Sequence, residues 1–263
     1  MKLSEYIDDL VARGKCCFSV NEAVAVLNKS RQSIIHSIEH LKAGSKLASP
    51  AKGFYVVVTP EYRIYGCLPP EFFVPYLMKY WDYDYYGCLL TAAMYHGSSH
   101  QAPQVFQVMI EKKRLAIECG KVRVEFITRK NIKAIPKSEI STSKSVLNIS
   151  SPEATAMDLI CYPQRSGGIN HTLTVLSELY EKIKPDNLLS LLENQSELAW
   201  KQRLGYLLDI LGVNELTNVI HRFLAMQKRL DYVLLMPGLP MTSKVTRNEK
   251  WKIIENTTVE TDE

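Results

Sequence analysis

Residues 19–33 read SVNEAVAVLNKSRQS and contain two helix starts with a very short turn between them. Ser19 and Glu22 form a capping box, in which the Ser hydroxyl and the Glu carboxylate accept hydrogen bonds from free backbone N–H groups at a helix start. Ser30 is a second N-cap residue, and only Asn28 and Lys29 separate it from the preceding apolar run. The sequence therefore predicts helices over residues 19–27 and 30–43 that cross at a steep angle.

The residues on both sides of this helix pair fit a winged helix-turn-helix, a module that places one helix in the major groove of DNA. A further helix is expected over residues 2–13, and Gly44 is expected to end the helix over 30–43 with a positive φ. Leu47 and the run 54–58 flank residues 50–53, which predicts a β-hairpin, the wing, with Lys52 at its tip. Residues 1–60 hold eight Lys and Arg against five Asp and Glu. The alternative is a three-helix domain with no role in DNA binding.

The helix over residues 30–43 has one apolar and one polar face. Ile34, Ile38 and Leu41 recur at helical spacing and are expected to pack on the other two helices. The opposite face suits contacts with bases and phosphates. The residues predicted to contact DNA are Lys29, Ser30, Arg31, Gln32, Ser33, His36, His40 and, on the wing, Lys52.

Composition predicts a two-domain globular protein. The chain has 263 residues, of which 46% are hydrophobic and 23% charged. The first twenty residues carry charges throughout, and no stretch approaches the roughly 20 apolar residues of a membrane span, so we expect a cytoplasmic protein without membrane contact. The six cysteines are dispersed and are expected to be reduced thiols. Cys88, His96 and His100 suggest zinc, but Gly97 and two serines break the helical spacing, so no metal or cofactor is expected.

Composition also suggests the domain boundaries. The predicted fold is α+β, with a winged helix-turn-helix domain over 1–66 and a mixed α/β plus helical-bundle domain over 85–255. A connector rich in Pro and Tyr over 67–84 joins them, and a polar tail follows over 256–263. The tyrosines of the connector are interpreted as packing residues rather than base-stacking residues, because few basic residues lie among them.

The most basic stretch of the chain runs from Glu111 to Ser145, with ten Lys and Arg against four Asp and Glu. It contains a predicted hairpin over 115–118 and 122–128. Such a charge run is a solvated face or a surface for phosphates or an acidic partner. The predicted contacts, to a toxin or to phosphate, are Lys112, Lys113, Arg114, Arg123 and Arg129.

The last third of the chain is predicted to be helical. Ser151-Pro152-Glu153 combines an N-cap residue, a proline at the first helical position and an acidic residue favoured by the helix dipole. Amphipathic segments follow over 171–182, 185–192, 197–211 and 215–229, and short strands are expected over 232–235 and 251–254.

The order of these features resembles the AbiE-type abortive-infection antitoxin family (AbiEi), the antitoxins of type IV toxin-antitoxin systems. After the predicted winged helix, the resemblance rests on YY at 85–86, residues 89–97, SPEA at 151–154, MDL at 157–159, RLGYLL at 203–208 and NEKW at 248–251. It implies a bacterial transcriptional autorepressor that binds double-stranded DNA at repeats in its own promoter. It also implies that the C-terminal domain counters a cognate nucleotidyltransferase-like toxin.

A short winged-helix contact with DNA usually needs two occupied half-sites for specific repression. No dimerisation coiled coil is recognisable, since Gly167, Gly205 and Gly212 interrupt the apolar stripes. We therefore expect a monomer in solution that pairs on DNA.

The sequence leaves two alternative functions open. A metal-dependent nuclease could use Glu118 and Lys121, but these bracket a predicted turn, and the Ser141–Lys144 pair lies in a polar stretch that would not lower the lysine pKa. A protein-interaction adaptor would use the winged helix to bind protein instead of DNA. The sequence favours a protein that is not an enzyme.

Overall fold

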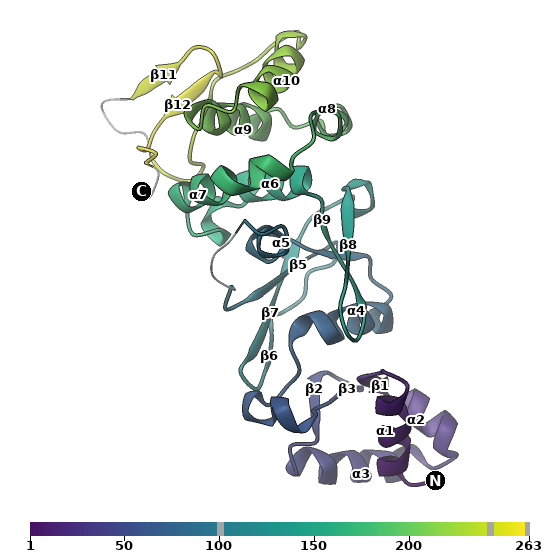
Figure 1. The fold of residues 1–263 in the computed structure, drawn as a ribbon. Helices are drawn as coiled ribbons and strands as arrows, with labels where there is room; N and C mark the ends of the chain where they lie inside the picture. Colours follow the sequence, from purple (N-terminus) through teal and green to yellow (C-terminus); the bar gives the residue numbers. More distant parts are fainter. Residues whose placement is uncertain (99–102, 241–244, 261–263) are drawn as a thin grey trace. The chain divides into compact units, whose positions relative to one another are not determined.

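The computed structural model describes residues 1–98, 103–240 and 245–260, and the chain is a mixed α+β protein (Figure 1). It divides into two compact units. Unit 1 comprises residues 1–87, 104–132 and 139–149, and unit 2 comprises residues 88–103, 133–138 and 150–263. These units differ from the boundaries expected at 66/67 and 84/85. Those boundaries remain predictions, because compact packing alone does not define a functional domain.

Unit 1 begins with three helices and a three-stranded antiparallel sheet (Figure 1). The helices are α1 (Leu3–Ala12), α2 (Val20–Leu27) and α3 (Arg31–Ala43). The sheet has the order β1-β3-β2, with β1 (Cys17–Ser19), β2 (Leu47–Ala51) and β3 (Phe54–Val57). Buried apolar side chains from all three helices and from the sheet form one core cluster, including Leu3, Phe18, Ile34, Ile38 and Tyr55.

The helix starts predicted around the short turn are confirmed. Ser19 Oγ accepts from Glu22 N–H at 3.2 Å, and the Glu22 carboxylate accepts from Ser19 N–H at 2.6 Å. Ser30 Oγ accepts from Ser33 N–H, and Asn28 takes the left-handed conformation that turns the chain between α2 and α3. Helix α3 ends at Gly44 as predicted, but the positive φ expected there was wrong: Gly44 has a φ of −84°, and Ser45 adopts a φ of 52°.

The segment predicted as a connector contains a helix. After a 3₁₀ turn, η1 (Pro60–Tyr65), helix α4 runs over Pro70–Trp81 with Pro75 inside it. Proline lacks the N–H that would bond to the carbonyl four residues earlier, here Glu71 C=O. Ser145 Oγ–H donates to that carbonyl at 2.8 Å, so the acceptor freed by Pro75 is satisfied from a distant part of unit 1. Within this segment, the Tyr76 hydroxyl donates to Lys144 C=O at 2.6 Å and the Tyr80 ring packs on Phe54, although Tyr80 is 41% exposed.

The other sheet is mixed and has six strands, in the order β6-β7-β5-β4-β9-β8. It belongs to unit 1, except that the first residues of β8 and the last residue of β9 are assigned to unit 2. The predicted hairpin is β6 (Ile117–Cys119) with β7 (Val122–Thr128), and β5 (Phe106–Ile110) pairs with β7 in parallel. Strand β4 (Tyr85–Gly87) pairs with β5. Strands β8 (Lys137–Ser141) and β9 (Val146–Ser150) complete the sheet, and neither was predicted from the sequence.

Unit 2 is mainly helical, as predicted (Figure 1). Helix α6 (Pro152–Cys161) starts as expected, with Ser151 Oγ accepting from Ala154 N–H, and the buried Glu153 carboxylate accepts from Lys184 N–H at 3.0 Å. The other helices are α5 (Leu89–Tyr95), α7 (Ile169–Leu179), α8 (Pro185–Asn194), α9 (Ala199–Ile210) and α10 (Asn214–Ala225). Three short 3₁₀ turns connect parts of the chain: η2 (Ile132–Ala134), η3 (Pro163–Arg165) and η4 (Tyr180–Lys182).

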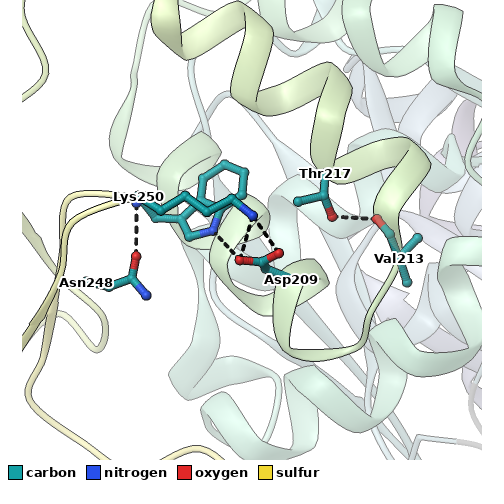
Figure 2. A network of polar contacts seen from close by, with 6 residues as sticks. Asp209, Val213, Thr217, Asn248 and Lys250 are labelled. Carbon is teal, nitrogen blue, oxygen red and sulfur yellow. Dashed lines mark hydrogen bonds and ion pairs between the residues drawn. The ribbon is translucent and has the colours of Figure 1, made fainter.

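The C-terminal segment of unit 2 is fixed to α9. Strands β10 (Val233–Leu234), β11 (Thr246–Asn248) and β12 (Ile253–Glu255) form a small sheet. Figure 2 shows the Asp209 carboxylate, on α9, held by Lys250 Nζ at 2.8 and 2.9 Å. Trp251 Nε1–H donates to the same carboxylate at 2.9 Å, and the indole is fully buried against Gly205 of α9.

Lys201, also on α9, is buried and gives a testable dependence of stability on pH. Its ammonium donates to the carbonyls of Leu192 and Gln195 at the C-terminal end of α8, and burial lowers its pKa from 10.5 to about 8. The unfolded chain therefore binds more protons than the folded protein between these two pH values, so the free energy of unfolding should rise with pH in that window. Relative to Lys201→Met, the wild type should gain stability from pH 8 to 10.5 in urea titrations. A pH-independent difference would contradict the lowered pKa, and the exposed-site variant Lys228→Met controls for loss of charge.

Candidate nucleic-acid interface

Helix α3 presents one buried and one exposed face, as predicted. Ile34 and Ile38 are buried in the core of unit 1, at 1% and 0% exposure. On the opposite side, Gln32, His36 and His40 are exposed, and Ser33 is exposed at the edge of that face. Lys29 is exposed in the turn before the helix. The sequence thus folds into a helix whose free polar groups all lie on one side.

Two of the predicted contact residues already have partners within the protein. Ser30 caps α3 through Ser33 N–H. Arg31, in the first turn, donates from Nη1 to Asn21 Oδ1 at 2.6 Å, which holds the guanidinium against the surface of α2. The position of Asn21 was not predicted, because this pairing depends on the angle between α2 and α3.

Basic side chains line a groove beside α3. The groove has a volume of about 320 Å³ and is lined by Lys2 at the start of α1, by Lys29, and by His36 and His40 of α3. No acidic residue is among its lining residues. This groove therefore suits an anionic group such as a backbone phosphate, and Lys2 is a residue that the sequence analysis missed.

The hairpin tip that carries Lys52 is braced by α4. The Tyr80 hydroxyl donates to Lys52 C=O at 3.2 Å, and the Tyr80 ring packs on Phe54 with centroids 5.4 Å apart. Gly53 takes a φ of 77°, which closes the turn. The Lys52 side chain is exposed. The tip is thus held in place while its ammonium remains accessible.

The predicted basic strip separates into two groups. Arg114 lies over the Trp81 ring at 4.6 Å and over the Tyr83 ring at 5.1 Å, and it donates to the Tyr83 hydroxyl at 2.8 Å. Lys112 lies over the Tyr83 ring at 5.0 Å. Within the described part of the chain, neither has a carboxylate at ion-pair distance. Their charges are therefore oriented by aromatic rings but not neutralised.

Arg123 and Arg129 form the second group, which is less available for contact with a partner. Arg123 lies 3.8 Å from the Glu118 carboxylate, and Arg129 is partly buried beyond the end of β7. Lys113 is exposed beside Lys112. The aromatic partners of Lys112 and Arg114 come from the segment predicted as a connector, so both features are recognisable in the sequence but their contact is not.

The described residues contain no group of three or more His, Cys, Asp and Glu side chains arranged to hold a metal ion, and His100 lies outside them. The carboxylate of Glu118 faces Arg123, and Lys121 lies over the Tyr65 ring, so the residues considered for a nuclease do not converge. In the described part of the chain, no helix combines the length and apolar character needed to cross a bilayer.

One family comparison covers the region that holds all six strands of the large sheet and helices α5 to α9. Residues 85–210 match the family model of the AbiEi antitoxin C-terminal domain. The resemblance predicted from the sequence is therefore confirmed. The match supports an antitoxin role in a toxin-antitoxin system and implies a cognate toxin.

A solved structure extends the likeness to nearly the whole chain. The crystal structure of the RV2827C protein from Mycobacterium tuberculosis matches with a TM-score of 0.68 at 16% sequence identity, over 95% of this chain and 90% of that one. At this identity the likeness shows a shared fold. No curated protein matches the sequence.

Proposed function

We propose that residues 1–66 form a winged helix-turn-helix and that the protein is a DNA-binding autorepressor as well as an antitoxin. The observation that carries the DNA-binding part is α3, with its core face buried and its polar face exposed beside a groove lined by Lys and His. In this proposal the hairpin that carries Lys52 is the wing. The antitoxin part rests on the family match, and the proposed target is a nucleotidyltransferase-like toxin.

Salt dependence tests whether the winged helix binds DNA or serves as a protein adaptor. Neutralising phosphates with Lys and Arg releases counterions, so log affinity for duplex DNA should fall linearly and steeply with log salt concentration. An adaptor would show weak DNA binding at any salt concentration. The titration uses the full chain and a duplex containing the promoter repeats.

We also propose that the protein is a monomer in solution and that two copies pair on DNA. A single winged helix contacts a short stretch of duplex, so two repeats occupied together would supply the specificity. The affinity per site should be higher for two repeats than for one, and light scattering without DNA should give the mass of one chain. A stable dimer without DNA, or equal affinity per site, would contradict the proposal.

The exposed basic residues near the aromatic rings are proposed to contact the toxin. Reversing Lys112, Lys113 and Arg114 to Glu should weaken neutralisation at least tenfold, because three positive charges, two of them oriented by aromatic rings, would become repulsive to an acidic partner. A growth-rescue assay with titrated antitoxin expression measures the effect, with folding checked by circular dichroism.

Arg123→Glu is the matched control for this triple variant. Its guanidinium is already paired with Glu118, so its reversal should have the smaller effect per charge. A folded triple variant that protects as well as the wild type would show that these residues form only a solvated surface.

A further inference from the structure

We propose that Cys67 and Cys119 form a redox modification site, at which a peroxide converts the two thiols into a disulfide. Both residues lie in unit 1: Cys67 follows η1, and Cys119 ends β6. They are far apart in the sequence, and the fold brings their side chains together, with the Cys67 thiol as hydrogen-bond donor to the Cys119 sulfur.

The backbone beside these cysteines fixes their approach. Lys121 N–H donates to Tyr65 C=O at 2.7 Å, and a Cβ built on Gly66 would lie 3.0 Å from Gly120 Cα. The two segments therefore cross with Gly66 close to Gly120. Cys67 directly follows the first of these glycines, and Cys119 directly precedes the second. A disulfide requires a Cα separation of about 4.4–6.8 Å, and cysteines that flank so close a backbone crossing are well placed to meet this requirement.

The two thiols differ in reactivity. The hydrogen bond from Cys67 lowers the pKa of Cys119 to about 7, although partial burial opposes this effect. The same hydrogen bond, together with burial, raises the pKa of Cys67. The hydrogen bond therefore favours the thiolate form, the nucleophile, on Cys119 and the protonated form on Cys67.

Small oxidants can reach the site. Cys119 is partly exposed. A pocket of about 290 Å³ borders Cys67 and is lined also by Tyr62, Tyr65, Lys121 and Val122. Hydrogen peroxide is small enough to enter such a pocket. Large thiol reagents cannot reach Cys67, because its side chain is buried.

The proposed oxidation is balanced in two steps. The Cys119 thiolate attacks one peroxide oxygen, the O–O bond breaks, and the products are a sulfenic acid and hydroxide, which takes up a proton as water. The Cys67 sulfur then attacks the sulfenic sulfur, its proton passes to the departing hydroxyl group, and a second water leaves as the S–S bond forms. The protein loses two electrons, and the peroxide gains them.

Cys16 and Cys17 provide a contrast within the same unit. Their sulfurs lie 3.5 Å apart, but the residues are adjacent in the chain. Cα atoms joined by a trans peptide are about 3.8 Å apart, which is below the range that an unstrained disulfide needs. Both are also buried, and Cys16 Sγ donates to Phe72 C=O. Two cysteines with neighbouring sulfur atoms are therefore not enough for the proposed site, which also needs a backbone that can accommodate a disulfide.

The test is peroxide treatment of the reduced full chain at pH 7, followed by alkylation and mass spectrometry of peptides without reduction. We expect one cross-linked peptide pair containing Cys67 and Cys119, with the loss of two hydrogens, reversed by dithiothreitol. The oxidised protein should melt about 5 °C higher, because the bond closes a long loop in the unfolded chain. Cys67→Ser should leave a sulfenic acid on Cys119 that dimedone captures, and Cys16→Ser should still form the cross-link.

Three outcomes would overturn the proposal. They are oxidation that joins any other pair, overoxidation of Cys119 in the wild type without a cross-link, and failure of both thiols to react under conditions that oxidise a free model thiol of similar pKa. Because the readout is a covalent bond in the full chain, none of these outcomes depends on DNA binding or toxin neutralisation.

Discussion

Replacing Gly205 with alanine is expected to destabilise the protein by about 3 kcal/mol. The added Cβ would overlap the indole ring of Trp251, whose nearest atoms already contact the Gly205 backbone. In most helices the same change would stabilise by up to about 1 kcal/mol, because alanine is the better helix former. The expected sign is therefore opposite to that of helix propensity, and it depends on the packing described for unit 2.

Trp251 is held too firmly to move aside. Its indole N–H donates to Asp209, and its backbone N–H donates to Asn248 Oδ1 at 3.0 Å (Figure 2). The His221 ring packs edge-on against the indole, with centroids 5.8 Å apart. An added methyl group must therefore shift α9 or break these hydrogen bonds.

Urea titration of Gly205→Ala measures this loss as a lower midpoint. Gly44→Ala is the matched control, because its Cβ would meet only ordinary contacts, the nearest being Leu41 C=O at 3.6 Å. The double variant Gly205→Ala with Trp251→Leu should lose less than the sum of its single variants, since the smaller side chain makes room for the added methyl group. A Gly205→Ala protein as stable as the wild type would disprove the packing account.

The second large effect concerns DNA affinity. Arg31→Ala together with Gln32→Ala is expected to weaken operator binding by about 2 kcal/mol, or about thirtyfold in Kd. Both side chains lie in the first turn of α3, where a recognition helix contacts bases and phosphates. Asn21 holds the Arg31 guanidinium in place, so little entropy should be lost when it binds.

A gel-shift titration at fixed salt concentration measures the change in Kd. Arg13→Ala is the control, because it removes one exposed guanidinium, paired with Asp9 on α1, outside the predicted DNA-binding residues. Its effect on Kd should be small. If the double variant binds as tightly as the wild type, α3 is not the helix that contacts DNA.

The parts of the fold that could be predicted depend on signals local in the sequence. The starts of α2, α3 and α6 follow from the N-cap residues that directly precede them. Strand β1 has only three residues, and its pairing with β3 comes from residues far along the chain. Helix α4 was missed because Pro75 argues against a helix, and Ser145, which satisfies the freed carbonyl, lies far away in the sequence.

The same distinction applies to the candidate sites. The exposed face of α3 follows from helical periodicity, so its residues could be named in advance. The stacking of Arg114 on Trp81 and the meeting of Cys67 with Cys119 join residues separated by long stretches of chain. No local pattern predicts such contacts, because they depend on how the strands of the large sheet are ordered.

The path of the chain between the two units limits what truncated proteins can reveal. The chain passes between the units five times, at 87/88, 103/104, 132/133, 138/139 and 149/150. No single truncation therefore separates one unit from the other. A fragment starting at Tyr85 would keep every strand of the large sheet but lose α4, whose Trp81 packs on Phe126 of β7 at 5.7 Å. Loss of activity in such a fragment would report exposed sheet surface as readily as a missing binding site, so point substitutions are the sounder way to locate function in this protein.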